Sequence, residues 1–139
     1  MFTTTVTYTD FNGTERTETC RFNLSQPEVI EMDASYPGGL EQTLRDVIDE
    51  KDSMKILAVF KKLLLASYGE KTPDGKRFVK SKEISEAFSQ TGAYEEIYMR
   101  IMRDTDFAIE FVNKIMPEKV QQEAAKLDAG TIVSASPKE

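Results

Sequence analysis

The sequence predicts a mostly helical α+β fold, with an N-terminal β-hairpin followed by a compact bundle of about six helices. Three observations lead to it. Apolar residues alternate with polar ones over the first 24 residues, they follow helical spacing from residue 25 onward, and the composition is 40% hydrophobic and 30% charged over 139 residues. We therefore predict one globular domain over residues 1–117, with the hairpin at 1–24 and the helical part at 25–117. Residues 118–139 are predicted to form a polar tail, partly helical and partly flexible.

The predicted hairpin turns at Asp10-Phe11-Asn12-Gly13. A two-residue Asn-Gly loop would place the apolar residues of the two strands on opposite faces of the hairpin. A three-residue loop, with glycine in the left-handed conformation, pairs Phe2 with Phe22 and places both apolar sets on one face. We therefore predict the three-residue loop. The apolar face then consists of Phe2, Val6, Tyr8, Cys20, Phe22 and Leu24.

Caps and helix breakers mark the helices. Ser25 and Glu28 form a capping box, and the helix behind them stops at Pro37-Gly38-Gly39. An amphipathic helix then runs from Leu40 to Ile48. After a strong turn at residues 72–75, Arg77 to Lys80 has the extended character of a short strand. The remaining helical signals are a helix capped by Ser81, an apolar stripe from Tyr94 to Met102, and a helix capped by Asp104 and closed by Pro117.

Residues 53–68 form the most apolar segment and are predicted to be one helix that ends at Gly69. A helix that is apolar over most of its circumference is usually central and covered by its neighbours. The alternative is that part of this face is exposed and binds a partner chain. We favour the central position, because large exposed apolar patches are rare, and the alternative stays open.

The composition disfavours several classes of function. With 24 acidic and 18 basic residues the net charge is −6, which disfavours binding to nucleic acid. The chain has no histidine, so the usual catalytic triads and zinc sites are excluded. Cys20 is the only cysteine and is predicted to be a small buried hydrophobe. No apolar run is long enough to cross a bilayer, so we expect a cytoplasmic protein without a membrane partner. For want of histidine and of any cofactor motif, we also expect that it is not an enzyme and has no cofactor or metal.

The segment from Lys71 to Lys82 holds five of the eighteen basic residues around a rigid Pro-Asp-Gly turn. It is either a solvated loop or a docking surface for an acidic partner, for which its charge would set orientation and association rate. The candidate partner-binding residues are Lys71, Pro73, Asp74, Gly75, Lys76, Arg77, Phe78 and Lys80.

Three strings of residues carry a resemblance to a known family. They are SYGEKTPDGKRFVKS from Ser67 to Ser81, FSQTGAY from Phe88 to Tyr94, and the opening TVTYTDFNG from Thr5 to Gly13. Together with Phe22-Asn23-Leu24, these strings resemble the tail assembly chaperones of long-tailed bacteriophages. The similarity runs from about residue 3 to Pro117 and is not expected to include the tail beyond it.

The resemblance implies a protein that acts in the cytoplasm of the infected bacterium during tail morphogenesis and is absent from the finished virion. Such chaperones bind the tape-measure protein, keep it soluble and help recruit tail-tube subunits around it. In many phages a programmed frameshift near the end of the gene also yields a longer product. The alternative is a structural virion protein, such as a tail or connector component. The sequence leaves open whether the chain forms a homo-oligomer.

Overall fold

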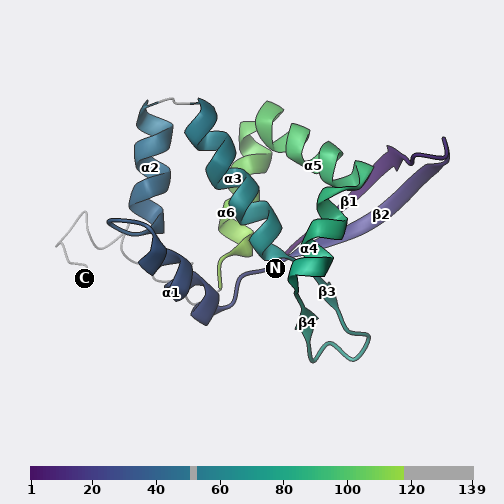
Figure 1. Ribbon diagram of the computed structural model, residues 1–139, viewed down its shortest axis with the longest axis horizontal. Coiled ribbons are helices and arrows are strands. Elements are labelled where there is room, and N and C mark those ends of the chain that lie inside the picture. The colour runs from purple at the N-terminus through teal and green to yellow at the C-terminus, as the bar shows by residue number, and fades with distance from the viewer. Residues whose placement is uncertain (51–52, 118–139) are drawn as a thin grey trace.

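The computed structural model describes the chain at residues 1–50 and 53–117, with side chains at 1–46 and 54–117 (Figure 1). The predicted tail at 118–139 lies outside the described residues. Two strand pairs alternate with two sets of helices. In chain order the elements are β1 (Phe2–Thr9), β2 (Glu15–Phe22), α1 (Gln26–Ser35), α2 (Leu40–Glu50), α3 (Ser53–Ser67), β3 (Tyr68–Lys71), β4 (Phe78–Val79), α4 (Lys82–Ser89), α5 (Gly92–Arg103) and α6 (Thr105–Ile115).

The N-terminal hairpin has the predicted register, with Phe2 opposite Phe22. The Asp10 amide donates to the Thr14 carbonyl over 2.8 Å, and Gly13 has φ 82°, as the three-residue loop requires. The Asp10 carboxylate fixes this loop, because it accepts hydrogen bonds from the amides of Asn12 and Thr14, each over 2.9 Å. The local sequence alone therefore determines how the two strands pair.

A second hairpin extends the sheet, giving the strand order β1-β2-β3-β4. The antiparallel partners of Arg21 and Phe22 in β2 are Gly69 and Tyr68 in β3. The prediction that the helix of residues 53–68 includes Tyr68 is wrong, because α3 ends at Ser67 and Tyr68 begins a strand. Four residues are too few to show an alternating pattern, and the partner that makes them a strand lies in β2, more than forty residues earlier.

The helices begin at the predicted caps. The Ser25 hydroxyl and the Glu28 side chain bond reciprocally to backbone amides at the start of α1, over 3.3 Å and 2.8 Å. Ser81 and Asp104 accept hydrogen bonds at the starts of α4 and α6, each over 3.1 Å. These contacts confirm three helix starts.

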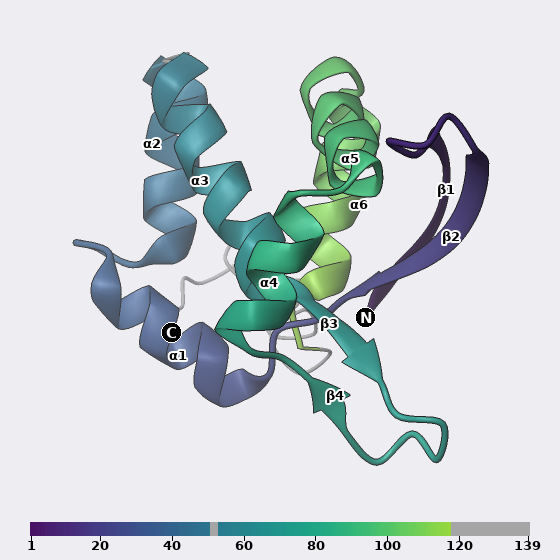
Figure 2. The ribbon, with the colours of Figure 1, turned by 45° about the vertical axis from the view of Figure 1, so that its right-hand side comes forward.

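The core lies between the β1–β2 hairpin, which curves around α5 and α6, and helix α3 (Figure 2). Aromatic rings fill its centre. Phe22 and Phe111 are completely buried, and their ring centroids lie 5.7 Å apart in an edge-to-face arrangement. Tyr68 stacks on Phe88 with a centroid distance of 3.8 Å. This cluster joins the first hairpin, the second hairpin and the C-terminal helices into one packed unit.

Helix α3 combines the two alternatives considered for it. Val59, Leu63 and Leu64 are buried in the core, which confirms the central position for that side of the helix. Ile56 and Phe60 lie on the same face of the helix, between Val59 and Leu64 around its axis, but are only half-buried. Among the described residues, no helix is both long enough and apolar enough to cross a membrane.

Candidate functional site

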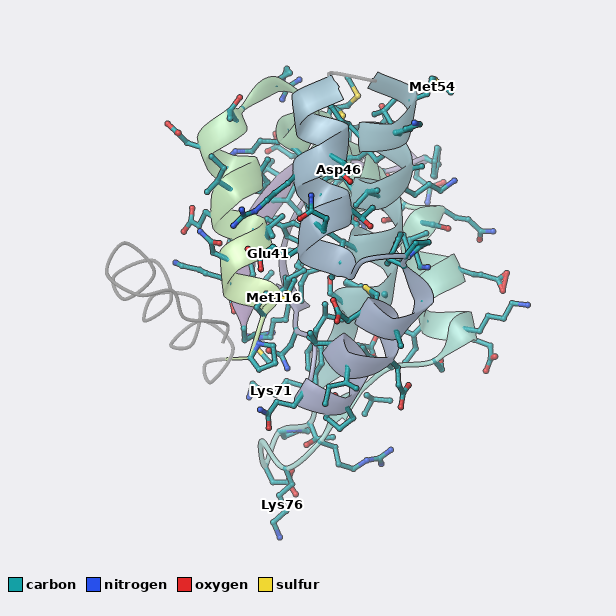
Figure 3. All side chains as sticks on the ribbon, turned by 90° about the vertical axis from the view of Figure 1, so that its left-hand side faces the viewer. Glu41, Asp46, Met54, Lys71, Lys76 and Met116 are labelled. Carbon is teal, nitrogen blue, oxygen red and sulfur yellow. The ribbon has the colours of Figure 1, made fainter. Side chains whose placement is uncertain are left out.

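An apolar groove of about 500 Å³ opens between α2 and α6. Its deepest residues are Ile101 and Ala108, which are buried, and its rim includes Ile109, which is 53% exposed. The face that carries α2 and α6 is turned toward the viewer in Figure 3. The apolar side chains between floor and rim are all half-buried: Leu44 of α2, Ile56 and Phe60 of α3, Met102 of α5 and Val112 of α6.

The groove exists because the apolar surface of α6 is wider than the part that the core buries. Phe107, Phe111 and Ile115 are buried against the rest of the core. Val112 lies at the edge of this buried face, beside Ala108, and Ile109 lies further around the helix; both line the groove. A helix that only covered a core would carry a polar residue at the position of Ile109.

The charged residues that line the groove, Glu41 and Arg45, neutralise each other within α2. Their side chains pair over 2.7 Å. This is an i,i+4 pair on the surface of one helix. The groove therefore presents apolar surface without a strong net charge, and its shape and chemistry suit the apolar side of an amphipathic helix.

The basic segment predicted to bind a partner forms the β3–β4 hairpin, and its turn is rigid. The Thr72 amide donates to the Arg77 carbonyl over 2.9 Å, and Gly75 has φ 76°. The Asp74 carboxylate accepts from the Lys76 amide over 3.0 Å and from the Thr72 hydroxyl over 2.7 Å. These two hydrogen bonds, first from the Lys76 amide and then from Thr72, lower the pKa of Asp74. Asp74 therefore builds the turn.

The hairpin separates its basic residues into two groups. Lys71, Lys76 and Arg77 are exposed and form no ion pair with any other described residue. They lie together with Pro73 and Gly75 at the end of the hairpin, while Phe78 is half-buried at the start of β4. That these residues bind a partner remains a prediction.

Lys80 points inward, unlike the other predicted binding residues. Its side chain is 18% exposed, and its ammonium pairs with the Glu28 carboxylate over 2.6 Å. The same nitrogen donates to the carbonyls of Asn23, over 2.8 Å, and Ala66, over 3.2 Å. Lys80 thus connects β4 to α1, to the end of β2 and to the end of α3. In this position it stabilises the fold.

Two further observations describe the chemistry of the molecule. Burial raises the pKa of the Cys20 thiol to about 11, as expected for the small buried hydrophobe that the sequence predicts. Within the described residues, no three His, Cys, Asp or Glu side chains are placed to hold a metal ion.

The sequence reasoning did not predict the groove as a site. Its residues come from four helices, and no local pattern unites them. The available signals were the apolar circumference of residues 53–68, for which partner binding was the alternative, and the extra apolar residue Ile109 on α6.

Comparison with known proteins places these features in a family. Searches of curated proteins and of solved structures found no match. The model of the family described as phage tail assembly chaperone matches residues 1–139. The match therefore continues past Pro117, where the resemblance was expected to end. The chain belongs to the phage tail assembly chaperone family.

Proposed function

We propose that this chain binds the tape-measure protein of its phage, keeps it soluble in the cytoplasm of the infected bacterium and helps recruit tail-tube subunits around it. Binding is stoichiometric and needs no ATP. Membership of the chaperone family supports the general role. The observation that carries the mode of binding is the apolar groove between α2 and α6.

A tape-measure protein is expected to be a long helical chain with apolar seams, which aggregate unless they are covered. The groove offers half-buried apolar side chains from four helices, so one amphipathic helix fits as its occupant. Complete burial of one large apolar side chain contributes about 1.5–3 kcal/mol. Three such anchors on the partner would contribute roughly 5–9 kcal/mol before the entropic cost of association, which is compatible with a reversible complex. Reversibility suits a chaperone that must release its client.

Met102 gives the groove an adaptable wall, because its unbranched side chain can adjust to different partner residues. Successive segments of a long tape-measure chain differ in sequence. A groove that tolerates this variation would let several copies bind along one client.

The test is co-expression with the tape-measure protein encoded in the same gene cluster, followed by affinity purification and sizing. We expect a soluble complex, a tape-measure protein that is insoluble alone, and no copy of this chain in purified particles. Absence of a complex, together with a band in purified virions, would instead assign the chain to the structural tail or connector proteins.

A further inference from the structure

The base of the basic hairpin lies near the C-terminal end of α6, the helix whose residues up to Asn113 line the groove. The Ile115 carbonyl, at the C-terminal end of α6, accepts from the Leu24 amide over 2.8 Å, and the adjacent Asn23 amide donates to the Ser67 carbonyl over 2.8 Å. Tyr68 then starts β3. The last turn of α6 and the base of the hairpin are therefore separated by only a short piece of chain. In Figure 3, Glu41, Met116, Lys71 and Lys76 follow one another along the same side of the molecule.

The two faces of the hairpin differ in charge. In the β3–β4 pairing Lys71 is opposite Phe78 and Glu70 is opposite Val79. Since side chains alternate along a strand, Lys71 shares its face with Lys80, and Glu70 lies on the other face. Lys80 contacts Glu28 of α1. Lys71 is therefore on the side of the hairpin that faces α1.

Glu70 lies instead beside Glu18 and Glu83, around a separate depression on the far face. Positive charge on the α1 side thus comes from Lys71, with Lys76 and Arg77 at the tip, against the single carboxylate of Asp74. The rigid turn holds these cations outward, so a partner would bear little cost for ordering the backbone.

We propose that the groove and the α1 side of the basic hairpin form one continuous docking surface. Its occupant is an amphipathic helix of the tape-measure protein. This helix leaves the groove beside the C-terminal end of α6 and continues there into an acidic segment. This inference rests on the proposed function and adds the chemistry of the recognised segment. The groove supplies apolar contact, and the two charged residues that line it, Glu41 and Arg45, are already paired with each other, so the hairpin sets the direction in which the helix lies.

Overlapping peptides from the tape-measure protein of the same phage provide the probe. Binding of each labelled peptide to the full chain is measured by fluorescence anisotropy at low and at high salt. We expect the binding peptides to carry apolar residues at helical spacing, followed or preceded by a cluster of Asp and Glu. The double variant Lys76→Glu/Arg77→Glu should bind them about tenfold more weakly at low salt, and the difference should shrink at high salt because exposed charges are screened.

Two controls make the test specific. Lys61→Glu makes the same change of charge as the single variant Lys76→Glu, but on the exposed surface of α3. It should leave the affinity for the peptides nearly unchanged. Neutralising the acidic cluster of the peptide should weaken binding to the unmodified chain but have no further effect on the double variant. The direction is tested by cross-linking: a photoreactive group at the acidic end should react with the hairpin and not with α2.

The outcomes separate this inference from the proposed function. If neither the peptides nor the intact tape-measure protein binds, the proposed function fails and this inference fails with it. If they bind and Ile109→Asp abolishes binding while Lys76→Glu/Arg77→Glu does not weaken it, only the acidic extension is refuted. An equal loss with Lys61→Glu would show a general charge effect and would also refute it. Binding of a single-stranded oligonucleotide to the hairpin as tightly as the peptides bind would likewise refute the acidic extension.

Discussion

Substitution of Ile109 is the sharpest test of the groove. Ile109 is 53% exposed on α6, so its side chain adds little to the packed core. It nevertheless lies at the rim of the groove, where a docked helix would cover it. A change at this position should therefore separate partner binding from folding.

The expected magnitude follows from that exposed fraction. Burying a whole isoleucine side chain contributes about 1.5–3 kcal/mol. Only the exposed half remains to be buried on binding, so Ile109→Ala should lose at most about 0.8–1.6 kcal/mol, or roughly a 4- to 15-fold weakening. Ile109→Asp also forces a carboxylate into an apolar interface, which costs several kcal/mol more, and should weaken binding by roughly a hundredfold or more.

The assay is titration calorimetry or anisotropy with the tape-measure protein or its binding peptide, beside a urea unfolding curve for each variant. Ile30→Asp is the matched control, because Ile30 is 67% exposed on α1 and does not line the groove. Both aspartate variants should unfold at nearly the urea concentration of the unmodified chain, since each changes an exposed helix position.

Equal affinity of Ile109→Asp and the unmodified chain would refute the groove as the binding site. A similar loss with Ile30→Asp would show that binding depends on general surface properties.

Four further predictions concern the fold. Lys80→Met should lower the free energy of unfolding by about 1–3 kcal/mol in urea titrations, because it removes the ion pair with Glu28 and leaves two carbonyls without their donor. Burial raises the pKa of Glu28, but hydrogen bonds from Lys80 and the Ser25 amide lower it by more, so its folded pKa lies below the usual 4.5. The Glu28 carboxylate therefore stabilises the fold above pH 4.5, and this stabilisation is lost as the pH falls through its folded pKa. Glu28→Gln should make the free energy of unfolding less sensitive to acid. An unchanged dependence of that free energy on pH would contradict the role of Glu28. Gly69→Ala should lower the melting temperature more than Gly13→Ala does. A β-carbon at Gly69 would lie 2.8 Å from the Val79 carbonyl oxygen, whereas a β-carbon at Gly13 would meet open space and only the unfavourable φ opposes it. Equal shifts of the melting temperature would exclude this crowding. Cys20, with its pKa raised by burial to about 11, should react with a disulfide reagent at pH 8 only after urea unfolding, and rapid reaction of the native chain would show that the hairpin opens.

Much of the fold was predictable because its determinants are local. The turn of the first hairpin depends on Asp10, which bonds to amides two and four residues later. The capping box of α1 needs only Ser25 and Glu28, three residues apart. Interactions over such short separations form with little loss of chain entropy, and residue type and spacing are enough to identify them.

Strand β3 and the role of Lys80 were beyond such reasoning. Tyr68 and Gly69 form a strand only because β2 offers its edge to them. The partners of Lys80 include Glu28 and Asn23, which are 52 and 57 residues away along the chain. In sequence, Lys80 is one of several similar lysines in a basic segment, and only its position in the fold distinguishes it from Lys76.

The amino-acid sequence by itself determined the class of fold, the register of the first hairpin, the helix caps and the family of the protein. The tertiary structure decided the candidate site. The groove is made by Leu44, Phe60, Met102 and Val112 from four helices, and each of these residues taken alone has the pattern of an ordinary core position. Whether such a residue is covered or left open depends on which helices pack beside it, and that is set by long-range contacts which residue spacing does not encode.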